Sequence, residues 1–296
     1  MKRVSLVLIL LLVLAPPLLA DRGGIPFKPH VKIFEPNQRA MIAWNGTEQI
    51  LLLSTDLKTS EPTEVLEVLP LPTEPKVTKG DLGTFRRATE LINKKIRRPP
   101  PPRAAKGRVG APAAPKRPAG EVTFHKKIGA HDISVTHVLS TEGFIEWVEA
   151  YLKSKGVKNP TIPGAMKKLI TEYLREGFAW FVFDVVSLDE ELKTHDAIQY
   201  RFKTKFLYYP MKISSTGSGH TSVELLILTP KLLSKFTGIP ASRVDLRHEP
   251  ISITAGELKS LHSEMAALLG HREDMKLRIW RIQGELSSFD RDLIAH

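Results

Sequence analysis

The sequence predicts an α+β fold in which a mostly antiparallel sheet is packed by amphipathic helices and interrupted by a disordered Pro/Arg-rich insertion. Three observations lead to this expectation. Short apolar and alternating runs, typical of strands, recur along most of the chain. Helical periodicity is clearest in residues 141–155, 163–176 and 255–269. Proline and arginine accumulate in residues 97–120, where apolar residues are too few to form a core.

The N-terminal part of the core, residues 21–96, is expected to be rich in strands. Asn45-Gly46 separates the apolar runs RAMIAW and EQILLLSTD, and this pair is a strong hairpin signal because both residues tolerate a positive φ. The segment TEVLEVLPLP predicts a strand whose two prolines end its hydrogen bonding. An amphipathic helix is expected over residues 82–96.

The densest apolar stretch, residues 140–213, is expected to contain most of the core. Thr141 is a favourable N-cap for the first of its two helices, and Gly177 follows the end of the second. The run 178–186 is apolar on both faces except for Asp184. This pattern predicts a central strand that is covered on both sides.

Aromatic and basic residues are mixed in residues 198–210, which read IQYRFKTKFLYYP. A half-buried strand explains the pattern, with aromatic side chains inside and cations outside. The alternative is an exposed surface that stacks sugars or bases. Further along the chain, we expect strands over residues 220–230, 248–254 and 275–286, and short helices over residues 230–236 and 287–296.

The first twenty residues, Met1 to Ala20, predict a secretory signal peptide or an N-terminal membrane anchor. Two basic residues precede the apolar run VSLVLILLLVLA, and Ala20 stands directly before Asp21. Leu18 occupies a position where the cleavage site prefers a small residue, so both alternatives remain open. In either case the rest of the chain is expected to be extracytoplasmic, secreted or held at the membrane.

Residues 97–120 form a basic, proline-rich linker without an acidic residue. Its seven cations, with Lys2 and Arg3, carry most of the formal net charge of +11, so the remaining chain is close to neutral. A solvated spacer explains the linker. The alternative is an arm that contacts an anionic lipid or envelope polymer, and specific nucleic-acid binding is not expected. The residues that would make this contact are Arg97, Arg98, Arg103, Lys106, Arg108, Lys116 and Arg117.

Composition limits the chemistry and the setting of the protein. The chain has no cysteine, which excludes disulfides, thiolate metal sites and cysteine nucleophiles. Few amides and many Lys, Arg and Glu residues are typical of a thermophile. Asn45-Gly46-Thr47 is a glycosylation sequon, although the hairpin turn explains the same residues without a glycan at Asn45.

The residues do not predict a catalytic, cofactor-binding or metal-ligating set. His125, His131 and His137 recur every six residues, but Gly129 interrupts the register, so structural histidines are favoured over a zinc site. Asp184 is the one acid whose apolar surroundings suggest a shifted pKa.

An ion pair would explain Asp184 without any catalytic role. The expected partner of Asp184 is Arg201 or Lys203. The other explanation without a catalytic role is that Asp184 faces the edge of the sheet.

Four segments in a fixed order carry a likeness to a known family. They read RAMIAWNGTEQILLLSTD, VLPLPTEPKV, GAHDISVTHVLSTEGFIEWVEAYLKSKGV, and IPGAMKKLITEYLREGFAWFVFDV leading to FLYYPMKIS and VELLILTP. Over roughly residues 31–230 the chain resembles a secreted prokaryotic family, the domain of unknown function numbered 2330. The resemblance implies an exported, envelope-associated domain, and it implies no activity and no site residue. Many members have cysteines near the mature N-terminus, where this chain has Asp21-Arg22-Gly23-Gly24.

We expect residues 21–96 and 121–296 to form one folded core joined by the linker, and two smaller units are the alternative. The expected function is a non-catalytic binding or structural module of the cell envelope, with a protein partner or an anionic polymer at the cell surface and no cofactor. The alternative is an extracytoplasmic hydrolase with a site assembled from distant residues, Asp184 and a histidine.

Overall fold

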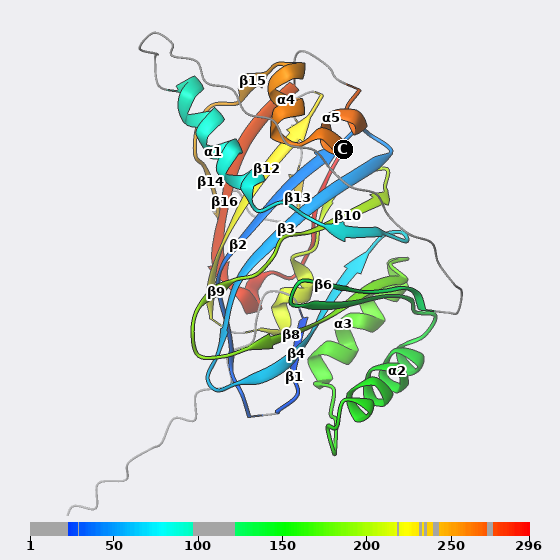
Figure 1. Ribbon diagram of the computed structural model, residues 1–296. Helices are drawn as coiled ribbons and strands as arrows, with labels where there is room; N and C mark the ends of the chain where they lie inside the picture. Colours follow the sequence, from blue (N-terminus) through cyan, green and yellow to red (C-terminus); the bar gives the residue numbers. More distant parts are fainter. Residues whose placement is uncertain are drawn as a thin grey trace, which may run out of the picture.

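The computed structural model describes residues 23–28, 30–96, 122–217, 219–230, 233, 236–238, 243–270 and 275–296 (Figure 1). The predictions for the N-terminal segment, residues 1–20, and for the basic linker, residues 97–120, lie outside the described residues. The short helix expected over residues 230–236 also falls largely outside them.

Strands form three sheets, which we call A, B and C. Sheet A has the order β1 (Gly23–Pro26), β4 (Thr63–Leu71), β8 (Trp180–Leu188), β7 (His131–His137) and β6 (Val122–Ile128). Sheet B has the order β14 (Val244–Leu246), β16 (Met275–Glu285), β12 (His220–Thr229), β2 (Ile33–Trp44), β3 (Glu48–Thr59), β10 (Ile198–Lys203) and β5 (Lys76–Lys79). In sheet B, β15 (Ile251–Ile253) also pairs with β16, and β9 (Lys193–Thr194) with β3. Sheet C has the order β11 (Leu207–Tyr209), β17 (Leu293–Ala295) and β13 (Phe236–Thr237).

The predicted α+β class with mostly antiparallel strands is confirmed. Among the strands that the structure describes, β12 and β2 form the parallel pair, and the other pairings are antiparallel. The predicted hairpin is also present, because β2 and β3 are joined at Asn45-Gly46 and Gly46 has φ +101°. Sheet B therefore combines strands from both sides of the linker.

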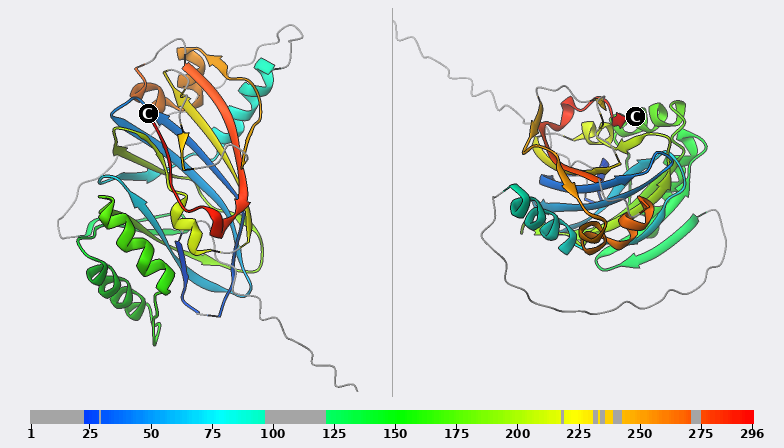
Figure 2. Two further views of the ribbon diagram at one scale, coloured as in Figure 1. Left: turned by 180° about the vertical axis from the view of Figure 1, so that it is seen from behind. Right: turned by 90° about the horizontal axis from the view of Figure 1, so that it is seen from above.

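Helices cover the two large sheets at opposite ends of the molecule (Figures 1 and 2). The pair α2 (Thr141–Ser154) and α3 (Gly164–Arg175) lies at the end that contains sheet A. A second group packs on the outer face of sheet B, where Met41, Ile50 and Leu52 meet its apolar side chains. This group consists of α1 (Gly83–Ile96), α4 (Ala255–Leu261) and α5 (Ser263–Leu268). None of the helices within the described ranges has the length and apolar character needed to cross a membrane.

The central strand β8 is covered on both faces, as predicted, although it begins two residues later than expected. It lies between β4 and β7 in sheet A. Phe181 and Phe183 point toward α2, where both rings contact the ring of Phe144. Val186 points the other way and packs with Leu57 of sheet B. Alternation along the strand thus gives each face its own apolar partner.

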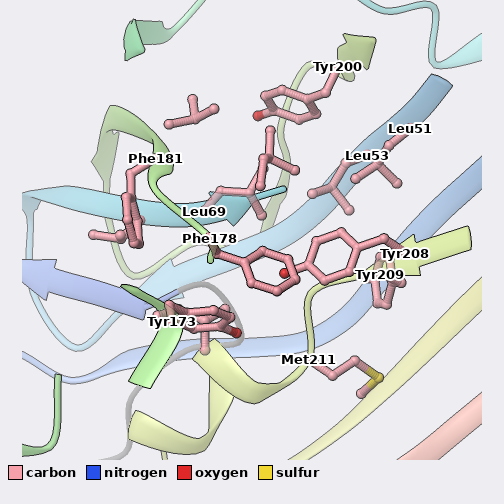
Figure 3. Close-up of a cluster of buried hydrophobic side chains, with 14 of the residues drawn as sticks. Leu51, Leu53, Leu69, Tyr173, Phe178, Phe181, Tyr200, Tyr208, Tyr209 and Met211 are labelled. Carbon is pink, nitrogen blue, oxygen red and sulfur yellow. The ribbon is translucent and has the colours of Figure 1, made fainter. Parts of the chain in front are cut away.

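Aromatic side chains from α3, β8 and β11 meet in the core between the sheets (Figure 3). The rings of Phe178 and Tyr208 lie 5.1 Å apart, and Tyr173 contacts Phe178 edge to face. The hydroxyl groups of Tyr173 and Tyr208 both donate to the buried carboxylate of Asp292, at 3.0 Å each. Backbone N–H groups of residues 211 and 212 donate to the same carboxylate. Asp292 thereby ties the C-terminal segment to the centre of the molecule.

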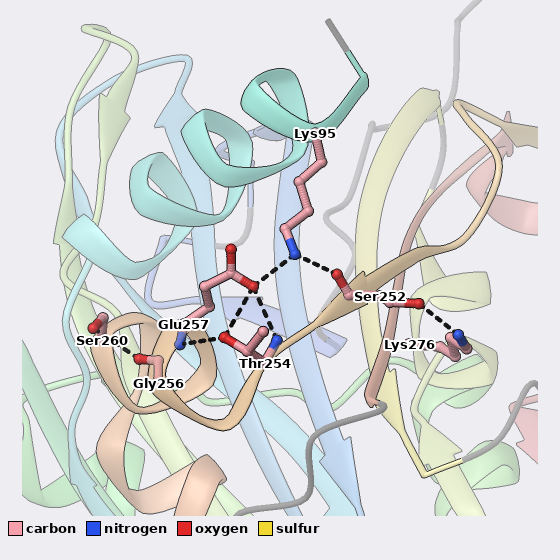
Figure 4. Close-up of polar contacts among 7 residues, drawn as sticks. All are labelled: Lys95, Ser252, Thr254, Gly256, Glu257, Ser260 and Lys276. Carbon is pink, nitrogen blue, oxygen red and sulfur yellow. Dashed lines mark hydrogen bonds and ion pairs between the residues drawn. The ribbon is translucent and has the colours of Figure 1, made fainter. Parts of the chain in front are cut away.

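The helix expected over residues 255–269 is divided into α4 and α5 at His262. His262 has an extended backbone, with φ −161° and ψ 109°, and its ring accepts a hydrogen bond from the N–H of Met265 as the cap of α5. The first half begins with a capping box, in which Thr254 and Glu257 bond each other's backbone N–H (Figure 4). Lys95 of α1 donates to Glu257 at 2.6 Å and so links the two helices.

Three further predictions need correction. The segment 198–210 is two strands in different sheets, because the chain leaves sheet B after Lys203 and joins sheet C as β11. The C-terminal residues form a 3₁₀ turn and then strand β17, which pairs with β11 and β13, rather than a helix. Ser140, not Thr141, caps α2 and accepts the N–H of Gly143. The first two corrections reflect distant strand partners that local periodicity does not contain.

We predict that cleavage within residues 97–120 leaves two fragments that stay associated. The β2–β3 hairpin lies between β12 and β10 in sheet B, so separation would expose both hairpin edges and the apolar core beneath them. Limited trypsin digestion followed by size-exclusion chromatography should give one peak that contains both fragments. Two separate, folded fragments would show that the chain forms two independent units.

We predict that Asp292→Ala lowers the free energy of unfolding by about 3–5 kcal/mol, because it leaves several buried donors without an acceptor. Urea denaturation measures this loss. Asp292→Asn should cost less, since its oxygen can still accept from three of these donors. An unchanged unfolding midpoint for Asp292→Ala would contradict the central role of this carboxylate.

The same carboxylate should give a defined pH dependence. Burial raises the pKa of Asp292 above its ordinary value, although the hydrogen bonds oppose this shift. The folded protein therefore holds this proton more tightly than the unfolded chain, and the contribution of Asp292 to stability falls as the pH rises between the two pKa values. Urea denaturation at about pH 4 and about pH 7 should show Asp292→Asn gaining stability relative to wild type at the higher pH.

Candidate functional site

Three ionisable side chains lie together on the inner face of sheet A, the face that packs against sheet B. Glu67 of β4 and Asp184 of β8 are direct cross-strand partners. Ile133 of β7 faces Asp184 from the other side, and His131 lies two residues before Ile133 on the same face. Neighbouring strands therefore bring the three groups together, although they are distant in the sequence.

The three side chains form a compact, buried cluster. His131 Nδ1 lies 2.6 Å from Asp184 Oδ2, which is a short hydrogen bond. One carboxylate or imidazole atom from each of Glu67, His131 and Asp184 lies within 4.8 Å of the other two. Their exposed fractions are 3%, 2% and 2%, so bulk solvent does not reach them.

Sheet B supplies the opposite wall of this site. His195 follows β9, and its backbone N–H donates to the carbonyl oxygen of Thr55 on β3 at 3.0 Å. The ring of His195 meets the ring of His131 edge to face, with 5.8 Å between their centroids. Alternation along β3 places Thr55 on the same inner face as Leu53 and Leu57. We call these five residues the polar layer: Thr55, Glu67, His131, Asp184 and His195.

The polar layer separates two apolar regions between the sheets. On one side, Leu53 and Leu69 belong to the main core cluster. On the other side, Leu57 and Val65 belong to a small separate cluster with Val186. On each of β3, β4 and β8 one polar residue, Thr55, Glu67 or Asp184, thus lies between two apolar residues of the same face.

The turn between β6 and β7 sets the position of His131. Gly129 has φ +59°, a left-handed conformation that glycine adopts without steric cost. A Cβ atom at this position would lie 2.1 Å from the carboxylate of Asp196, the residue that follows His195. The turn that precedes His131 therefore lies directly beside the residue that follows His195.

The structure places the expected site residues differently from the prediction. Asp184 does not pair with Arg201 or Lys203, because it points between the sheets and binds His131. Arg201 instead forms a two-point ion pair with Glu48 on the adjacent strand β3.

Of the three recurring histidines, only His131 belongs to the polar layer. The other two are exposed: His125 lies 2.6 Å from Asp132, and His137 stacks on Trp180.

Sequence reasoning missed Glu67, Thr55 and His195. Glu67 carried a signal, since all of its neighbours within two positions are apolar, as for Asp184. Thr55 and His195 carried none, because only the packing of sheet B on sheet A brings them to the site.

Other expected features have simpler outcomes. In the aromatic and basic segment, residues 198–210, the tyrosines and Phe202 are buried while Lys203 is exposed, which fits a half-buried strand.

The side chain of Asn45 accepts hydrogen bonds from the N–H groups of Thr47 and Glu48, as a turn residue does. The basic linker, with its seven proposed anion contacts, lies outside the described residues.

An aromatic pocket opens on the outer face of sheet A, next to the start of α2. Its volume is about 420 Å³, within the size range of ligand sites. His137 stacks on Trp180 with 4.6 Å between ring centroids, and Trp147 stacks on Phe183 at 4.3 Å. Leu139 stands at the pocket with 83% of its surface exposed. The lining also includes Thr136, Val138, Ser140, Gly143 and Phe144.

Comparison with known proteins decides the family. A family model described as "uncharacterized protein conserved in bacteria (DUF2330)" matches residues 16–266. The chain belongs to the DUF2330 family. No curated protein matches this DUF2330 chain.

Two solved structures show a weak likeness to the DUF2330 chain. One is a mutated baculovirus P35 after caspase cleavage, with 9% identity, a TM-score of 0.40, and coverage of 89% of this chain and 99% of that one. The other is baculovirus P35, with 9% identity, a TM-score of 0.33, and coverage of 89% and 91%. Neither TM-score reaches 0.5, so these structures do not bear on the function of the DUF2330 protein.

The polar layer of the DUF2330 protein has the chemistry of an ion site more than that of a catalytic site. Carboxylate oxygens and imidazole nitrogens are ligands for divalent metal ions. A hydrolase needs its acid and base within reach of a substrate, and Glu67, His131 and Asp184 are each at most 3% exposed. The aromatic pocket, in contrast, is open to solvent but lacks a carboxylate among its lining residues.

We predict that Asp184→Ala lowers the free energy of unfolding by about 3–5 kcal/mol, because it removes a buried partner of His131. Urea denaturation of the purified protein measures the change. Ser187→Ala is the matched control, since Ser187 is exposed on the same strand and should change stability by less than about 0.5 kcal/mol. Equal stability of Asp184→Ala and wild type would show that the hydrogen bond between His131 and Asp184 does not stabilise the fold.

Proposed function

We propose that this DUF2330 protein is an exported, envelope-associated binding module that holds an acidic polysaccharide of the cell envelope. The export segment Met1 to Ala20 and the basic linker supply the location and the charge. The aromatic pocket supplies faces on which sugar rings stack. The proposal rests on the proximity of this pocket to the point where the linker joins sheet A.

Strand β6, which follows the linker in the sequence, pairs with β7 beside the aromatic pocket. Val122, the first residue of β6 after the linker, pairs with Thr136, which lines the pocket. Lys116 and Arg117 precede Val122 by six and five residues. A chain spans at most about 3.5 Å per residue, so the covalent chain limits the Cα–Cα distance from either residue to Val122 to about 21 Å. A polymer that occupies the pocket can therefore contact the linker cations as well.

The chemistry of the two parts fits one ligand class. Trp147, Trp180 and His137 present flat rings at the pocket, and such rings stack on other ring systems. The cations attract negative charge at low ionic strength. An acidic polysaccharide offers both rings and charge, whereas a lipid headgroup surface needs the cations alone. These features favour the polymer.

The alternative of an extracytoplasmic hydrolase receives less support from the geometry. Its expected site combined Asp184 with a nearby histidine, and His131 is indeed bonded to Asp184. Both side chains are 2% exposed, so a polymer cannot contact them in this arrangement. The aromatic pocket, in contrast, is open to solvent, and its groups suit binding.

The test is adsorption to alginate, an acidic polymer of six-membered sugar rings, at about 20 mM and about 300 mM NaCl. Replacing the seven linker cations by glutamine should abolish most of the binding at low salt. Trp180→Ala should weaken binding about tenfold, as expected for the loss of one stacking contact. Trp280→Ala is the matched control, because Trp280 lies in β16, away from the pocket, and should bind like wild type.

Three outcomes would contradict the proposal. Adsorption to phosphatidylglycerol vesicles but not to alginate would assign the linker to lipid. Binding to neither would favour a protein partner at the cell surface. Full-length protein found in the cytoplasm, with Met1 to Ala20 retained, would contradict export; N-terminal sequencing of native protein from cell fractions decides this point.

A further inference from the structure

The polar layer contains the ligand set of a divalent metal site. Glu67, His131 and Asp184 each bring one ligand atom within 4.8 Å of the others. Metal–oxygen and metal–nitrogen bonds to such ligands are about 2.0–2.2 Å, so ligand atoms around one ion lie about 3–3.5 Å apart. Rotamer adjustments of about 1 Å would therefore bring the three groups around one ion.

The charges of the set match a divalent ion. Metal binding requires ionised carboxylates and a neutral imidazole, and such a set carries a charge of −2, which a divalent cation balances. This balance matters because all three side chains are at most 3% exposed, and burying a net charge is costly. An imidazole ligand favours ions such as Zn²⁺ and Mn²⁺ over Mg²⁺ and Ca²⁺, which prefer oxygen ligands.

A second, independent observation comes from the opposite wall. The hydroxyl oxygen of Thr55 is buried and has no hydrogen-bond partner in the part of the chain that the structure describes. Buried hydroxyl groups are normally paired, and an unpaired one is often explained by an ion or a water molecule. Thr55 lies opposite His195, whose ring contacts His131, so this hydroxyl faces the same site.

We propose that Glu67, His131 and Asp184 bind a divalent transition-metal ion on the inner face of sheet A, beside the ring of His195 on the facing sheet. The ion joins β4, β7 and β8. Its role is structural, because the site is closed to substrates, and it fixes the register of these three strands. This proposal does not depend on the polysaccharide-binding function.

The test uses the full chain, purified without a metal-affinity tag, treated with EDTA and dialysed. Calorimetric titration with Zn²⁺ should show one ion per chain, and the Tm should rise with Zn²⁺ and with Mn²⁺ but not with Mg²⁺. Glu67→Gln preserves shape and removes one charged ligand, so it should weaken Zn²⁺ binding at least about tenfold. Glu64→Gln is the matched control: Glu64 is exposed on the opposite face of the same strand and its variant should bind like wild type.

Two results would overturn the proposal. Folded wild-type protein that binds neither Zn²⁺ nor Mn²⁺ at one ion per chain would exclude the site, and this measurement needs no variant. An equal rise in Tm for Glu67→Gln and Glu64→Gln would place any bound ion elsewhere. If Glu67→Gln fails to fold, Asp184→Asn takes its place and should also weaken Zn²⁺ binding.

Discussion

The architecture depends on one constraint: the centre of sheet A must bury both of its faces. One face packs against α2 and α3, and the other packs against sheet B. β8 satisfies this constraint with an almost wholly apolar sequence. Its residues pair with β4 on one edge and with β7 on the other. Asp184 breaks the apolar pattern, and the fold accommodates it by placing ionisable partners around it. The site is thus a direct result of how the two sheets meet.

Local sequence signals were sufficient for much of the fold. The Asn45-Gly46 turn, the helices α1 to α3 and the central position of β8 all follow from short-range patterns. The errors occurred where a distant strand decides the outcome. Residues 293–295 become a strand because β11 and β13 are available beside them, and no local pattern contains that information. His262 divides a helix for which the apolar period alone predicted continuity.

The candidate site shows the same limit more sharply. Asp184 stood out in the sequence because it interrupts an apolar run, but its partner was wrongly expected to be a cation on a nearby strand. The hydrolase alternative pairs Asp184 with a histidine, but no local pattern identifies His131 as that histidine. Cross-strand register between β4, β8 and β7 determines the cluster, and register is a property of the assembled sheet. His195 comes from the other sheet, and its ring reaches His131 only because sheet B packs on sheet A.

The parallel pairing of β2 with β12 has a consequence for the order in which the chain folds. The β2–β3 hairpin is synthesised early, but its neighbours β10 and β12 include residues 198–203 and 220–229. Both edges of an apolar hairpin therefore remain open while most of the polypeptide is being made. Open edges of this kind recruit other strands, including those of other chains. The pairing of sheet B thus leaves both edges of the hairpin without their native neighbours until residues 198–229 have been made.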